Sequence, residues 1–189
     1  MRTMRTLAVL IGVALFSTTA EAKYEGHSAQ LINSFGKGKP EKWTLRATRT
    51  QYRLESADRK TAYIVTRAGT TLLLLDQKRA RSAGVPMALR TLFNIERTIG
   101  RTGGKPCMNT AKCRKAGVKR KFGRLCVKWV EVQTDVSGKS VGKTVYFVDK
   151  KMMRLIARTM PDGSRLELRR FKLGPQPAAA FEVPKDFKR

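Results

Sequence analysis

Few side chains in this sequence could do covalent or metal chemistry, and three of them are cysteines that lie close together, Cys107, Cys113 and Cys126. Three cysteines allow one disulfide and one free thiol, and spacing alone leaves the pairing open. A zinc site would need a fourth ligand at closer spacing, and the single histidine, His27, is far away in sequence. We therefore expect no metal site. We expect one intramolecular disulfide that includes Cys126, because this cysteine begins a predicted strand and could anchor a loop.

No pattern of catalytic residues accompanies the cysteines. A cysteine nucleophile needs a histidine partner, and His27 lies near the start of the expected mature chain. The sequence contains no G-x-S-x-G, H-E-x-x-H or phosphate-loop motif. We therefore expect a protein that is not an enzyme and that carries no cofactor.

The basic residues are the second chemical feature. Lysine and arginine number 40 against 14 acidic residues, a formal net charge of +26. Between residues 97 and 130, eleven residues are basic and none is acidic. A stretch of this kind is able to attract phosphate and other anionic groups. The candidates for anion binding are Lys112, Arg114, Lys115, Lys119, Arg120, Lys121 and Arg124.

Three kinds of anionic partner fit this charge: lipid headgroups, lipopolysaccharide and extracellular nucleic acid. Nucleic acid is the least expected, because Phe122 is the only aromatic residue of the stretch before Trp129 and bases stack on aromatic rings. The alternative is a solvated basic surface with no ligand, since much of the excess is spread along the whole chain. Apolar periodicity is weak here, so we expect a basic, cysteine-containing loop at about residues 101–126.

The first 22 residues have the features of a secretory signal peptide. Arg2 and Arg5 precede a ten-residue apolar run, and Ala20-Glu21-Ala22 is a cleavage signal of the small-x-small type. The apolar run is too short to span a membrane. We expect cleavage after Ala22 and a periplasmic or secreted product with no transmembrane segment. One disulfide is compatible with that compartment.

The elements that position these residues are mostly strands. Apolar and polar residues alternate in short segments, which is typical of an antiparallel sheet with one buried face. The segments cover residues 43–48, 51–56, 61–66, 70–76, 127–134, 143–149, 153–160 and 165–173. With an apolar share of 41%, the chain is able to form a core. We expect a single mainly β domain (α+β) over residues 23–189, with seven to nine strands.

One segment has helical periodicity instead. Pro86 is suited to a helix start, and Gly100 to the cap after its last turn. The spacing predicts an amphipathic helix over residues 87–99 that covers one face of the sheet. Residues that could line a lipid cavity there are Met87, Leu92, Ile95, Ile99, Trp129 and Tyr146. The alternative for each is that it simply belongs to the core.

The second half of the chain also resembles a known family. The matching segments are 123–129 (GRLCVKW), 144–149 (TVYFVD), 153–156 (MRLI), Asp162-Gly163 and 177–187 (PAAAFEVPKDF). These resemble secreted bacterial domains of uncharacterised function that are distant relatives of the lipoprotein carriers LolA and LolB. The resemblance implies an open half-barrel, a curved antiparallel sheet with the helix on its concave face, and a concavity able to hold acyl chains. The basic cysteine-containing insertion and the single clear helix depart from the carriers, and no functional residue of theirs maps onto this chain.

Two main hypotheses of function follow, and a third stays open. The first is an exported, non-enzymatic protein that carries or senses lipid or lipoprotein acyl chains in the cell envelope. The second is a basic module that binds polyanions such as lipopolysaccharide, anionic headgroups or extracellular nucleic acid. The third is a structural or assembly protein of the envelope. The sequence leaves the oligomeric state open.

Overall fold

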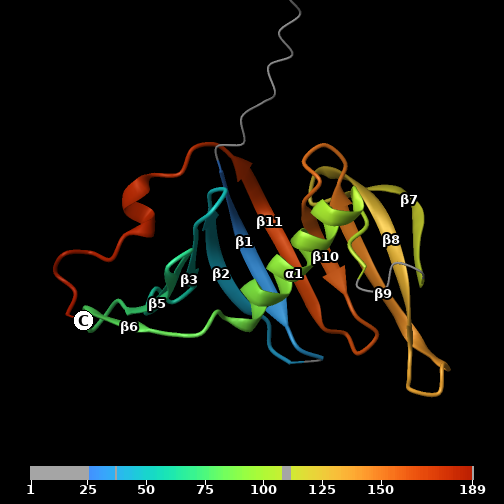
Figure 1. Ribbon diagram of the computed structural model, residues 1–189, viewed down its shortest axis with the longest axis horizontal. Helices are drawn as coiled ribbons and strands as arrows, with labels where there is room; N and C mark the ends of the chain where they lie inside the picture. Colours follow the sequence, from blue (N-terminus) through green and yellow to red (C-terminus); the bar gives the residue numbers. More distant parts are fainter. Residues whose placement is uncertain (1–25, 37, 108–111, 189) are drawn as a thin grey trace, which may run out of the picture.

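The computed structural model describes residues 26–36, 38–107 and 112–188. The predicted signal peptide lies outside the described residues. Within them, eleven antiparallel strands form one open sheet in the order β6-β5-β4-β3-β2-β1-β11-β10-β9-β8-β7 (Figure 1). The strands are β1 His27–Ser34, β2 Glu41–Ala47, β3 Tyr52–Ser56, β4 Thr61–Thr66, β5 Gly69–Leu74, β6 Arg79–Ser82, β7 Cys113–Lys121, β8 Arg124–Thr134, β9 Ser140–Asp149, β10 Leu155–Thr159 and β11 Arg165–Leu173. The predicted fold class, a curved antiparallel sheet with a helix, is confirmed.

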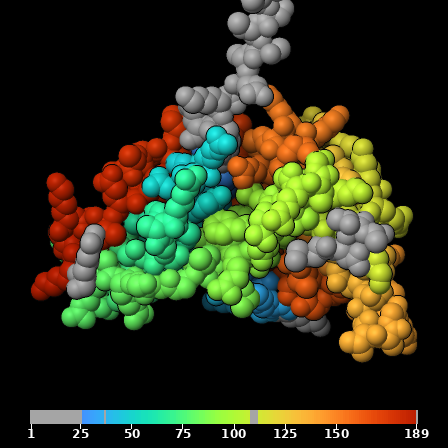
Figure 2. Space-filling view, viewed as in Figure 1, coloured from blue at the N-terminus to red at the C-terminus, as the bar shows by residue number. Residues whose placement is uncertain are grey.

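The helix α1, Met87–Thr102, crosses one face of the sheet in front of β1, β11 and β10 (Figure 1). Its buried residues, Ala88, Leu89, Leu92, Ile95 and Ile99, pack into one core with residues of β1, β2, β3, β9, β10 and β11. We call this face of the sheet the helix side. The outer face of α1 is open to solvent (Figure 2).

The helix is longer than the sequence predicted. Gly100 continues it, and Gly103 is the residue that ends it, with a left-handed φ of 63° and its N–H bonded to the carbonyl of Ile99. A glycine is suited to that position because it adopts positive φ without strain. The Thr102 hydroxyl then accepts the N–H of Lys105 at 3.0 Å, which fixes the turn after the helix.

The opposite face of the sheet is covered at one end by the C-terminal segment. A short 3₁₀ helix, η2 Ala178–Phe181, leads to residues that pack on β4, β5 and β6 through Val183 and Phe187. The N–H of Ala80 in β6 donates to the carbonyl of Lys188 at 2.8 Å. The β6 edge of the sheet is therefore capped by the chain itself.

The prediction of a loop up to residue 126 was wrong. Residues 113–121 form β7, the outermost strand at the other edge of the sheet, and pair with β8. The sequence pattern does not predict this strand, because an edge strand with both faces exposed needs no alternation of apolar and polar residues. A shift of the pairing register after Lys115, next to Gly117 with φ of 101°, breaks the alternation further. No helix among the described residues combines the length and the hydropathy needed to cross a membrane.

Candidate functional site

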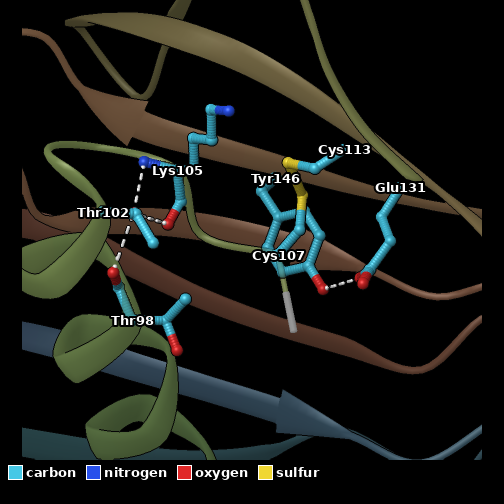
Figure 3. The surroundings of a disulfide bond; sticks show 7 residues. All are labelled: Thr98, Thr102, Lys105, Cys107, Cys113, Glu131 and Tyr146. Atoms are coloured by element: carbon cyan, nitrogen blue, oxygen red, sulfur yellow. Dashed lines mark hydrogen bonds between the residues drawn. A yellow bond between two sulfur atoms is a disulfide. The ribbon is translucent and has the colours of Figure 1, made fainter. Parts of the chain in front are cut away.

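The disulfide joins Cys107, in the turn after α1, to Cys113 at the start of β7 (Figure 3). Cys107 is fully buried in the helix-side core, so the bond fastens the first residue of β7 to that core. Next to it, the Tyr146 hydroxyl donates to the Glu131 carboxylate at 2.6 Å (Figure 3). Burial, followed by the Glu131 interactions, raises the pKa of Tyr146 and keeps it a donor at neutral pH.

The expectation that Cys126 takes part in the disulfide was wrong. Cys113 pairs with Glu131 across the β7–β8 ladder, whereas Cys126 pairs with Lys119. Register therefore places Cys126 on the face opposite to Cys113. Its thiol is buried, and desolvation together with the nearby Asp149 carboxylate raises its pKa to about 11. A thiol in this state is protonated at neutral pH and a poor nucleophile.

The hairpin of β7 and β8 carries six of the seven predicted anion-binding residues, with Lys112 directly before it. We call residues 113–134 the basic hairpin. These side chains lie on both faces of the sheet rather than in one patch. Residues that pair across two strands share a face. Lys115 pairs with Trp129 and Arg120 with Leu125, on the helix side, whereas Arg114 pairs with Val130 and Lys119 with Cys126, on the other face. Lys115, Arg114, Lys119 and Arg120 are exposed and form no salt bridge among the described residues.

Three of the candidates have local partners. Arg124 donates from Nε to the Asp149 carboxylate at 2.6 Å and stands 5.1 Å from the ring centre of Phe171. The Lys121 ammonium lies 4.7 Å from the ring centre of Phe122. Lys112 donates to the Thr134 hydroxyl at 2.8 Å. These contacts hold the hairpin and its turn in shape, so the remaining basic side chains are the ones most able to meet a ligand.

Exposed apolar side chains lie among these charges at the end of the hairpin. Val118, Phe122 and Leu125 are 44%, 37% and 44% exposed. Phe122 sits in the turn with a φ of 49°, and the Arg169 guanidinium is 4.9 Å from its ring centre. Apolar residues at the tip of a basic hairpin are a pattern suited to the interface of an anionic membrane.

The predicted lipid-lining residues take different places. Leu92, Ile95, Ile99 and Tyr146 are at most 2% exposed, and Trp129 packs against the same core. Met87 is 64% exposed at the start of α1. Together, then, five of these side chains fill the space between helix and sheet in this conformation, and the sixth lies at its rim.

A half-buried polar cluster beneath α1 was missed by the sequence analysis. Glu96 of α1 accepts a hydrogen bond from Arg154 Nη1 at 2.5 Å, and this ion pair ties the helix to the start of β10. Burial raises the pKa of Glu96 against the opposing effect of Arg154. Burial and then the charge of Glu96 raise the pKa of Tyr52, against the opposing effect of Arg154. A usable signal was present: Glu96 lies beside Ile95 on the buried stripe of the predicted helix.

His27 lies on the helix side of the sheet and is 2% exposed. Its ring stacks on that of Phe171 with centres 4.5 Å apart. Burial, and then the charge of Arg154, lower the pKa of His27 to about 4, so it is neutral at physiological pH. Among the described residues, no group of three or more His, Cys, Asp or Glu side chains is arranged to hold a metal ion.

Comparison with known proteins identifies the fold. No protein-family model and no curated protein sequence matches the chain. An uncharacterized conserved protein from Thermus thermophilus has 12% identity and a TM-score of 0.53 over 87% of this chain and 88% of its own. In the MucA/MucB complex of Pseudomonas aeruginosa, the matching chain has 10% identity and a TM-score of 0.54, and the match covers 86% of this chain and 57% of that one.

A candidate outer membrane lipoprotein-sorting protein domain from Vibrio parahaemolyticus also matches, with 12% identity and a TM-score of 0.37 over 85% of this chain and 90% of that one. The fold relationship itself rests on the two structures with the higher TM-scores. At these identities the similarity concerns the fold and not the ligand.

Proposed function

We propose that this protein is an exported, non-enzymatic protein of the cell envelope that binds anionic lipid through the basic hairpin. The observation that carries the proposal is the combination, at the end of β7 and β8, of exposed basic residues with Val118, Phe122 and Leu125. Each basic side chain near an anionic surface contributes about 1 kcal/mol of attraction. Apolar tip residues add burial in the headgroup region, which charge alone would not provide.

The disulfide supports the export half of the proposal. A disulfide between Cys107 and Cys113 is stable in an oxidising compartment and is rare in a reducing cytosol. The signal-peptide pattern of residues 1–22 predicts the same destination. Together they favour a periplasmic or secreted location.

A second candidate is the carriage of acyl chains between α1 and the sheet. Among the described residues one helix covers this face, which favours the candidate, because movement of that element would expose Leu92, Ile95, Ile99 and Tyr146. The helix would have to break its Glu96–Arg154 ion pair to do so. Mass spectrometry of lipid extracted from protein purified from its native envelope tests this candidate, which fails if no acyl lipid co-purifies.

The main proposal is tested by sedimentation with vesicles that contain phosphatidylglycerol. Replacing Arg114, Lys119 and Arg120 with Gln removes three exposed charges, so binding at low salt should weaken roughly 100-fold at about 1 kcal/mol per residue. High salt should remove binding of the native protein. The melting temperature should stay nearly unchanged, since exposed charges contribute little to stability.

A matched control uses three exposed basic residues at the turns of the opposite half of the sheet, Arg49, Lys60 and Arg67. Replacing them with Gln lowers the net charge by the same amount. If both triple variants lose binding equally, the hairpin is no site and the charge acts only as a whole. If the hairpin variant binds normally, the proposal is wrong.

A further inference from the structure

A pocket of about 290 Å³ lies on the face of the sheet opposite to the helix side. Its lining comes from β1, β2 and β3, which lie side by side, and from the turn after β3 (Figure 1). Leu45 of β2 is buried in the helix-side core, so its neighbours Thr44 and Arg46 point to the opposite face. Both of these side chains are exposed, and a ligand in the pocket is able to reach them.

The register of the three strands brings the polar lining residues together on this face. Thr44 pairs with Gln30 of β1 and with Glu55 of β3. Arg46 pairs with Arg53 of β3, two residues further along the same two strands. Residues that pair across strands share a face and lie close to one another. The pocket is therefore walled by side chains that all point to the same side of the sheet.

Three arginines and one carboxylate line the pocket, and three positive charges with one negative charge leave a net charge of +2. Arg53 is already engaged, because its guanidinium donates to Glu55 at 2.9 Å and to the carbonyl of Ala180 at 3.3 Å. Arg46 and Arg59 are exposed and form no ion pair or side-chain hydrogen bond with another described residue. Two guanidinium groups are therefore available to a ligand.

The charge and the donors of this pocket match a phosphate group. A guanidinium presents N–H donors in a planar fork that fits two oxygens of a phosphate. A phosphate monoester carries about two negative charges at neutral pH, which equals the net charge of the lining in magnitude. The Thr44 hydroxyl and the Gln30 amide add neutral donors on the same face. The volume is just below the usual range of small-molecule sites, about 300–1,000 Å³, and suits one phosphate with a short substituent.

We propose that this pocket binds a phosphate monoester, with Arg46 and Arg59 donating to the phosphate oxygens. Thr44 and Gln30 donate to oxygens that the arginines leave free. The ion pair of Arg53 with Glu55 forms the wall between them, and its bond to the C-terminal segment holds that wall in place. The site lies in the half of the sheet away from the basic hairpin and does not depend on the function proposed for the hairpin.

Isothermal titration with methyl phosphate and methyl sulfate tests the class of ligand. The two probes have the same shape, but at about pH 7.5 methyl phosphate carries about two negative charges and methyl sulfate one. In about 0.15 M salt, which screens exposed charges, methyl phosphate should bind saturably at one site per chain. Methyl sulfate should bind about tenfold more weakly or worse. Equal binding of the two probes, or no saturable binding of methyl phosphate, overturns the proposal.

Single replacements test the assignment of the donors. Arg46→Gln and Arg59→Gln should each weaken binding of methyl phosphate about tenfold or more, because each removes charge-assisted hydrogen bonds. Arg49→Gln is the matched control: this exposed arginine lies in the turn between β2 and β3, outside the pocket, and its replacement removes the same charge. If Arg49→Gln weakens binding as much as Arg46→Gln, only net charge matters and the assignment is wrong.

Two further variants separate this site from the basic hairpin and from effects on folding. The hairpin variant with Gln at 114, 119 and 120 should bind methyl phosphate normally, and loss of binding there would place the phosphate on the hairpin and overturn the proposal. Replacing both Arg46 and Arg59 with Gln should leave the melting temperature of the ligand-free protein nearly unchanged. Methyl phosphate should raise the melting temperature of the native protein but not that of this double variant, and an equal rise in both overturns the proposal.

Glycerol 3-phosphate and vesicles that contain phosphatidic acid distinguish two sources of a phosphate monoester. Glycerol 3-phosphate should bind the native protein at least about tenfold more tightly than the double variant, and equal binding overturns the proposal. If the native protein also binds the vesicles more tightly than the double variant, a lipid headgroup reaches the site. If the vesicles bind both proteins equally while glycerol 3-phosphate distinguishes them, the ligand is a soluble phosphate ester.

Discussion

Protonation of His27 should destabilise the fold. The ring is 2% exposed and stacked on Phe171, and Arg154 places a positive charge nearby, so the charged imidazolium is disfavoured and its pKa falls from 6.5 to about 4. A pKa difference of one unit corresponds to about 1.4 kcal/mol, so this fall corresponds to about 3 kcal/mol of unfolding free energy.

The sign follows from where protons bind. Between pH 6.5 and about 4, the unfolded chain protonates its histidine while the folded chain does not. Stability from His27 is thus fully present above pH 6.5 and is lost as the pH falls to about 4. Glu96 acts in the opposite direction in its own range, since a raised carboxyl pKa lowers stability as the pH rises through it.

The assay is the comparison of the native protein with His27→Phe by urea denaturation between pH 7 and pH 4. Phenylalanine keeps a ring for Phe171 to stack on and has no proton to bind, so the difference in unfolding free energy between the two proteins should change by about 3 kcal/mol over this range. Because His27 is the only histidine, its NMR titration needs no assignment. A midpoint near 6.5, or identical pH slopes for the two proteins, would refute the reasoning.

Three further predictions concern other parts of the chain. Replacing Cys107 and Cys113 with Ser should lower the unfolding free energy, measured by chemical denaturation, by about 2 kcal/mol, because the disulfide closes a loop with a sequence separation of 6. The native protein should also show one free thiol per chain when it is denatured without reductant. Glu96→Leu should cost about 3–5 kcal/mol because it removes the carboxylate that faces the Arg154 charge, and adding Arg154→Leu should recover part of that loss. Intact-mass measurement of the exported protein should place its N-terminus at Lys23, and retention of the first residues would contradict the signal peptide.

The sequence by itself determined the class of the fold. Alternation of apolar and polar residues with period two, and one apolar stripe with period 3.6, indicate which faces of the elements are buried. These patterns correctly predicted the strand at residues 61–66, which is β4, and the start of α1. The predicted end of the helix was wrong. A glycine ends a helix where the backbone adopts positive φ, and Gly103 does so, whereas Gly100 continues the helix. The exposed strand β7 lacked a pattern, because no core selects its side chains.

Pairings between distant residues were decided by tertiary structure alone. Sequence could count the cysteines, but the register of β7 on β8 places Cys113 on the side of Cys107 and Cys126 on the other. The ion pair of Glu96 with Arg154 likewise depends on how α1 crosses the sheet. Local patterns record whether a side chain is buried, whereas its partner is fixed by register and packing between segments far apart in the chain, which no single stretch of sequence contains.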